Sequence, residues 1–337
     1  MGERPTPREV GENKAERKAS ELLKHRFRHG VAAEAFNSDF ADKLFKQEQR
    51  KSEIDERSIE IANQVTNEAL AELGLDQFDV PSKNIYFFDP GVVDDAELQR
   101  HMRSYFDHHS VAVTISSHQS ILLDLEEIQN PLARASVLLH EIIHLKAAYT
   151  TRMHFQQGLD LAQMGLQRQV RINKKRRFVG EGLNEAIVAE IERRLLPKLL
   201  EAHEGLWGTA EQVYDSYEAL ARRESIAKRF HVPYDEVVYA GDNGDFALLG
   251  YPDQRNVLWY VVNKIADTKK VSSEEIWPLF LQTQFTGDVE KLEKFVDESF
   301  SVGAYRVLEK MAVEPSSARR TLDLLIKMYK AKHEHQD

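Results

Sequence analysis

The segment PLARASVLLHEIIHLKAAY, from Pro131 to Tyr149, constrains the fold more than any other part of the chain. Asparagine is a favoured N-cap and proline suits the first helical turn, so Asn130 and Pro131 predict the start of a helix. Apolar residues cover nearly its whole circumference, which predicts that the helix is buried. These residues are Leu132, Ala135, Val137, Leu138, Leu139, Ile142, Ile143 and Leu145.

Two histidines and a glutamate stand in the middle of this predicted helix, in the sequence HEIIH. Each helical residue advances by about 100°, so His140 and His144 lie about 40° apart, one turn from each other. Two imidazoles placed in this way can hold one metal ion. Glu141 lies about 60° to the side of His144, where it can reach a water on that ion as a general base without being a ligand.

The surroundings of Glu141 argue against a chance pattern. A buried carboxylate costs on the order of several kcal/mol unless another group compensates it. No lysine or arginine lies three or four residues from Glu141, so the usual helical ion pair is not available. A metal-bound water is therefore the predicted partner of Glu141.

The chain contains no cysteine, so a zinc ion must be held by imidazole and carboxylate groups. A catalytic zinc needs a third protein ligand besides the two histidines. The downstream candidate is Glu185 in the sequence GEGLNEAIVAEIERR, which predicts a second helix. Glu181 is a rival ligand, but the flanking glycines Gly180 and Gly182 are expected to place it before the helix proper.

The HEIIH motif followed by a helix with LNEA resembles the gluzincin metallopeptidases, the group typified by thermolysin. The resemblance implies that His140, His144 and Glu185 are ligands of one zinc ion and that Glu141 is the base. It also implies an α+β, zincin-like fold: mainly helical, with a small mixed sheet beside the HExxH helix and a helical C-terminal lobe. A peptide or protein substrate would bind in extended form along an edge strand, for which Ser120 to Leu125 is the match.

The resemblance departs from thermolysin in two places. The stretch between His144 and Glu185 is longer and is predicted to contain a β-hairpin within Gly165 to Gly182. One turn after the ligand glutamate, thermolysin-like enzymes have an acidic residue that steadies a zinc histidine, and this chain has Ala189 there. Glu190 and Glu192 lie nearby, so the acidic partner of the histidines is not assigned.

Outside these motifs the sequence predicts a simple order of elements. A helix is expected from Ser52 to Leu73 with Gly74 as its stop, followed by a small sheet. The helix with LNEA is expected to end or kink at Pro197. The later chain is expected to be mostly helical, with an interruption from Val232 to Pro252. The strands of the sheet are expected at Asn84–Phe88, Val111–Ile115 and Ser120–Leu125.

The predicted organisation has three parts. Residues 1–50 form a charged N-terminal leader, residues 51–197 a zincin catalytic lobe with both motif helices, and residues 198–337 a mostly helical C-terminal lobe.

Composition excludes several function classes. A net charge of -10 disfavours a general nucleic-acid binder, and no segment has the roughly 18 consecutive apolar residues of a membrane span. Because the first fifty residues lack the apolar region of a signal peptide, we expect a cytoplasmic protein. The oligomeric state is not predicted.

Gluzincins also use a tyrosine or histidine from the C-terminal lobe to stabilise the tetrahedral oxyanion. Tyr251, at the start of a helical pattern, is the first candidate for this role, and Tyr149 and His231 are the alternatives.

Four other polar groups are expected to be structural. The basic run Lys174–Arg177 is expected at the tip of a solvated hairpin, where it could favour acidic substrates. We expect His108-His109 to lie in a loop and Asp242–Asp245 to form a turn. The tail His333–His335 is expected to be a frayed terminus.

These observations favour a zinc peptidase in which a metal-activated water, with Glu141 as general base, hydrolyses peptide bonds. Two alternatives remain open. The chain could be a non-enzymatic binding module on a zincin scaffold, or a latent peptidase whose N-terminal leader covers the cleft.

Overall fold

The computed structural model describes residues 46–333, except 94–95, 97–98, 101–102, 104–110, 116–119, 155–157, 173–174, 203–216, 231–232 and 240–245. The described residues fall into two compact units, each built from segments that are distant in the sequence. Among the described residues, the first unit contains those from 46 to 146 and those within Glu192–Leu249, and the second contains those within Ala147–Ile191 and those from 250 to 333. The predicted division at residues 50 and 197 stays a prediction.

Helix α3 (Glu53–Glu72) is the first long element of the first unit. It begins at Ser52, whose side chain accepts from the backbone N–H of Asp55, while the Asp55 carboxylate accepts from the backbone N–H of Ser52. This reciprocal capping box satisfies two backbone donors at the helix start. Gly74, with a φ of +68°, follows the helix end, so the predicted helix and its stop are both confirmed.

Three strands form a small mixed sheet within the described part of the first unit. The order is β1 (Ile85–Phe88), β3 (Ser120–Asp124) and β2 (Ala112–Ile115). β1 pairs with β3 in parallel and β2 pairs with β3 antiparallel, which confirms the predicted small mixed sheet. Short 3-10 helices flank β1 at Ser82–Asn84 and Pro90–Val92.

The prediction that Ser120–Leu125 is an edge strand was wrong. β3 lies between β1 and β2, and all five of its residues are buried. A strand covered on both faces has a continuous apolar run rather than an alternating pattern, and Ile121, Leu122 and Leu123 are such a run. Among the described strands, β2 lies at the edge of this sheet beside helix α5.

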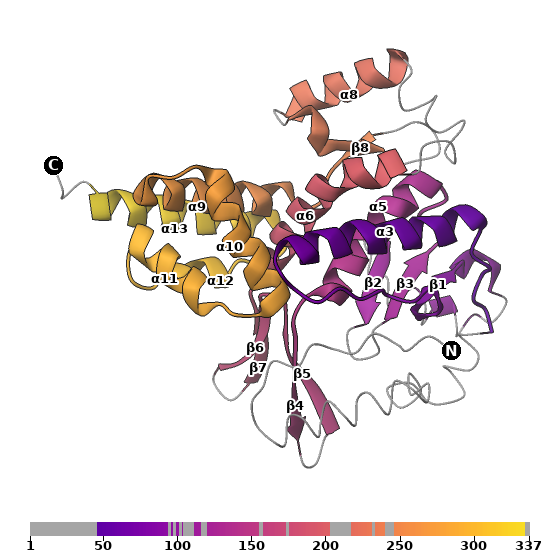
Figure 1. Cartoon of the computed structure of the whole chain (residues 1–337), viewed down its shortest axis with the longest axis horizontal. Coiled ribbons are helices and arrows are strands. Elements are labelled where there is room, and N and C mark those ends of the chain that lie inside the picture. The colour runs from indigo at the N-terminus through magenta and orange to yellow at the C-terminus, as the bar shows by residue number, and fades with distance from the viewer. Residues whose placement is uncertain are drawn as a thin grey trace. The chain divides into compact units, whose positions relative to one another are not determined.

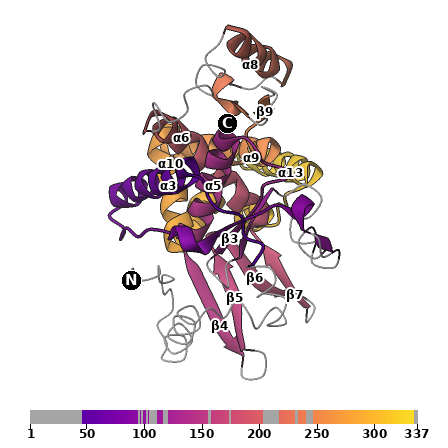
Figure 2. The same ribbon diagram turned by 90° about the vertical axis from the view of Figure 1, so that its right-hand side faces the viewer.

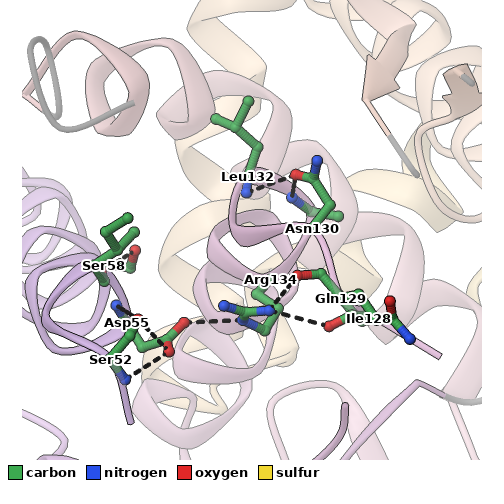
Figure 3. Close-up of polar contacts among 10 residues, drawn as sticks. Ser52, Asp55, Ser58, Ile128, Gln129, Asn130, Leu132 and Arg134 are labelled. Carbon is green, nitrogen blue, oxygen red and sulfur yellow. Dashed lines mark hydrogen bonds and ion pairs between the residues drawn. The ribbon is translucent and has the colours of Figure 1, made fainter. Parts of the chain in front are cut away.

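Helix α5 (Pro131–Lys146) is the predicted HEIIH helix and packs against α3 (Figure 1). The Asn130 side chain accepts from the backbone N–H groups of Leu132 and Ala133, as its N-cap role requires (Figure 3). Arg134 then donates to Asp55 of α3 at 2.9 Å, so the start of α5 is joined to the start of α3 (Figure 3).

Lys146, the last residue of α5, is fully buried. Its ammonium nitrogen donates to the Asn63 carbonyl, the Thr66 hydroxyl and the Asn67 side-chain oxygen, at 2.7 to 3.1 Å. Burial lowers the pKa of Lys146 to about 7, because the charged form loses its hydration, while Asp79 acts in the opposite direction.

This lowered pKa predicts a pH-dependent stability. Between about 7 and the usual value of 10.5, the unfolded chain binds a proton that the folded Lys146 does not. The free energy of unfolding should therefore rise with pH across this window, by about 1 kcal/mol per pH unit from Lys146 alone. Urea unfolding at several pH values should show this slope reduced in Lys146→Met. Lys198→Met, which changes a half-exposed lysine, should keep the wild-type slope, and equal slopes in all three proteins would contradict the prediction.

Four antiparallel strands open the second unit, and Figure 2 shows them side by side in chain order. They are β4 (Tyr149–His154), β5 (Gly158–Met164), β6 (Gln167–Ile172) and β7 (Lys175–Val179). β6 and β7 are the predicted hairpin, with Ile172 opposite Lys175. The structure adds β4 and β5, which were not predicted.

Helix α6 (Glu181–Ala202) follows β7 and carries the LNEA sequence. Its first turn is anchored in the second unit, because the backbone N–H of Gly182 donates to the Met311 carbonyl. A Cβ at Gly182 would lie 2.5 Å from the Ala312 carbonyl oxygen, so this close approach requires glycine.

Two predictions about α6 can be compared with the structure. The helix begins at Glu181 rather than after it, so that prediction was wrong. The helix does not end at Pro197, whereas the predicted alternative of a kink at this residue stays a prediction. A proline inside a helix removes one backbone hydrogen bond. The helix nevertheless continues past Pro197, and its neighbours Leu195, Leu196 and Leu199 are buried.

Helices make up most of the rest of the described chain (Figure 1). In the first unit, α8 (Tyr217–Phe230) precedes a 3-10 turn (Tyr234–Glu236) and the hairpin of β8 (Val237–Tyr239) and β9 (Phe246–Leu248), which lies in the predicted interruption. The helices of the second unit are α9 (Pro252–Lys269), α10 (Ser273–Thr286), α11 (Glu290–Ser299), α12 (Ala304–Glu309) and α13 (Pro315–His333).

The predicted α+β class, mostly helical with a small mixed sheet, is therefore confirmed, and the later chain is mostly helical as expected. Within the described residues, every helix is too short or too polar to cross a bilayer.

Candidate metal centre

Helix α5 brings the two histidines of HEIIH together. The Nε2 atoms of His140 and His144 lie 3.2 Å apart, and the ring centroids are 4.9 Å apart. Two nitrogens at about 2.0–2.1 Å from a tetrahedral zinc ion are about 3.3 Å apart, so the observed separation fits two ligands of one ion. His144 is only 4 % exposed, which limits competition from water.

Glu185 completes a group of three possible metal ligands. One ligand atom from each of His140, His144 and Glu185 lies within 4.8 Å of the other two. No other such group of histidine, aspartate or glutamate residues occurs in the part of the chain that the structure describes. The three residues predicted as ligands from the sequence are therefore close together, and they could hold a metal ion.

Glu192 is a site residue that the sequence did not assign. One of its carboxylate oxygens lies 2.9 Å from Nδ1 of His140, and the other accepts from the Ser136 hydroxyl at 2.5 Å. A carboxylate at Nδ1 favours the tautomer that carries its proton there, which leaves Nε2 as the nitrogen that can bind a metal. Glu192 therefore orients His140.

The spacing within α6 explains why Glu192 takes this role. It follows Glu185 by seven residues, which is about two helical turns, so both carboxylates lie on the same face of one helix. Ala189, at the position of the acidic residue in thermolysin-like enzymes, is fully buried. A search for acidic residues at seven-residue spacing would have selected Glu192 from the sequence.

Glu141 has a protein partner that the sequence did not indicate. The Thr114 hydroxyl, on strand β2, donates to Oε2 of Glu141. The same hydroxyl lies 3.5 Å from the Glu141 backbone carbonyl oxygen. Since Glu141 is only 8 % exposed, this charge-assisted hydrogen bond offsets part of the cost of burying its carboxylate.

Glu181, the rival ligand, lies outside the group of three ligand residues. Its pKa is raised, first by partial burial and then by the negative charges of Glu185 and Glu314. Burial, and after it the two neighbouring carboxylates, therefore disfavour the charged form of Glu181.

Tyr251 is the N-cap of α9 and has a left-handed backbone, with a φ of 56°. This conformation is uncommon for a residue other than glycine, and such residues are frequent at functional sites. Its role as oxyanion donor stays a prediction. Of the two alternatives, Tyr149 begins β4, and His231 lies outside the described residues.

Two of the four remaining polar groups lie partly within the described residues. Lys175, Arg176 and Arg177 belong to β7, and His333 lies 3.1 Å from the Ser299 carbonyl oxygen. His108-His109, Lys174, Asp242–Asp245 and Glu334-His335 lie outside the described residues.

Comparison with models of protein families, with curated proteins and with solved structures found no match for this chain. The chemistry and geometry of His140, His144 and Glu185 are therefore the observations that indicate a function.

Proposed function

We propose that this protein is a zinc-dependent peptidase of the gluzincin type. His140, His144 and Glu185 would hold one zinc ion, and Glu141 would act as general base. The observation that carries the proposal is the convergence of two imidazoles and a carboxylate around one point. Since the chain contains no cysteine, this nitrogen and oxygen donor set is the kind expected for zinc in a hydrolytic site.

When bound, zinc would supply Lewis acidity that polarises a substrate carbonyl and acidifies a water molecule. The protein's own residues would transfer the proton and orient the metal ligands. Glu141 would accept the proton of the attacking water and deliver it to the leaving amine. Glu192 would hold His140 in its metal-binding tautomer, because its carboxylate lies 2.9 Å from Nδ1.

The proposed substrate is a peptide in extended form that pairs with β2. This strand lies at the edge of its sheet among the described strands, and Thr114 links it to Glu141. Strand addition would hold the peptide through its backbone hydrogen bonds, so binding would depend little on the amino-acid sequence of the substrate. Tyr251 is the proposed oxyanion donor, and its left-handed backbone is the observation that favours a functional role.

Metal analysis combined with a cleavage assay tests the proposal. The purified chain should contain about one zinc ion and should cleave members of a peptide library, as expected for three protein ligands and one open position. A chelator should abolish cleavage, and added zinc should restore it. Zinc bound without any hydrolysis would instead favour a binding module, and protein that takes up no zinc would contradict the metal centre itself.

A further inference from the structure

The contact between Thr114 and Glu141 joins a strand to the helix that carries the metal ligands. Thr114 lies on β2, opposite Ile121 of the buried strand β3, so its backbone is held by the sheet. Threonine is also restricted at χ1 because its Cβ is branched. The hydroxyl that reaches Glu141 is therefore presented by a strand whose backbone pairs with the buried strand β3.

The Glu141 side chain needs such support for the role proposed above. A glutamate has several rotatable side-chain bonds, and ordering it costs up to about 2 kcal/mol of conformational free energy. The helix α5 fixes only the direction of its Cα–Cβ bond. Because the Thr114 hydroxyl donates to Oε2, it limits the positions that the carboxylate can take.

We propose that Thr114 is a positioning residue for the general base. Its hydroxyl holds Glu141 through Oε2 so that Oε1 is the oxygen that accepts the proton of the attacking water. This inference rests on the proposed peptidase function. It also assigns β2 a second role, because the strand proposed to bind the substrate would orient the base as well.

Kinetics of two Thr114 variants test the role. In Thr114→Val, kcat should fall about tenfold with KM nearly unchanged, because valine keeps the shape and loses the hydrogen bond to a charged group. Thr114→Ser keeps the hydroxyl and should recover most of the activity. Both variants should bind as much zinc as the wild type. Thr268→Val, which removes the hydroxyl of a threonine that bonds the Lys264 carbonyl in α9, should leave kcat unchanged.

A double-mutant cycle tests the contact without relying on activity. Urea unfolding of the metal-free protein should be compared for wild type, Thr114→Val, Glu141→Met and the double variant. The two changes should be non-additive, with a coupling of about tenfold in the folding equilibrium constant.

The outcomes separate the two proposals. Wild-type kcat in Thr114→Val, or additive effects in the cycle, would overturn the positioning role while leaving the peptidase function intact. An inactive wild-type protein that contains zinc would overturn the peptidase function and with it the role of Thr114 in catalysis, even if the coupling is measured.

Discussion

Glu141→Gln is expected to retain zinc and to lose peptide hydrolysis by a factor of about 10² to 10⁴, the usual contribution of a general base. Glutamine has nearly the size of glutamate, and its amide oxygen can still accept from the Thr114 hydroxyl, so the local structure should be preserved. The amide cannot take up the proton of the attacking water. The variant therefore removes the proton transfer while leaving the three ligands in place.

Two measurements on the same protein, zinc content and kcat, decide the role of Glu141. Glu72→Gln, at the last turn of α3, is a control for the loss of one carboxylate and should behave as wild type. Loss of zinc together with activity would identify Glu141 as a ligand rather than a base. Unchanged hydrolysis would exclude it from both roles.

The HEIIH helix was predictable because local rules and the apolar pattern agree. The Asn130 cap and Pro131 define the start of α5, and continuous apolar residues require its burial. The spacing of His140 and His144 follows from helix geometry alone, so their closeness was predictable as well.

Strand order was not predictable from the same information. Alternation and β-propensity indicate where strands occur, but they do not state which strands pair. The sequence order places β2 between β1 and β3, whereas the sheet places β3 in the middle. The assignment of the edge strand failed for this reason.

The residues that support the ligands depend on tertiary contacts. Thr114 reaches Glu141 from a strand 27 positions away in sequence, and Glu192 reaches His140 from a helix 52 positions away. No periodic pattern connects such pairs. The exception is the seven-residue spacing of Glu185 and Glu192, which places both carboxylates on one face of α6 and can be recognised in the sequence.

Glu192→Gln is expected to weaken zinc binding by about 10- to 100-fold, the usual effect of losing the carboxylate that supports a histidine ligand. The amide can still accept from Nδ1 of His140, but it lacks the negative charge that makes the imidazole a stronger donor to the metal. Competition with a chromogenic chelator measures the affinity. Ser136→Ala should have a smaller effect, because the Ser136 hydroxyl donates to the Glu192 carboxylate and that carboxylate is retained in this variant.

Glu201→Gln is the matched control for this measurement, since Glu201 is an exposed carboxylate on the same helix. Its zinc affinity should equal that of the wild type. If Glu192→Gln also binds zinc as tightly as the wild type, the contact at Nδ1 would be structural only. His140 would then need no charged partner to present Nε2, and the role proposed for Glu192 would be lost. The proposed ligand set of His140, His144 and Glu185 would be unaffected.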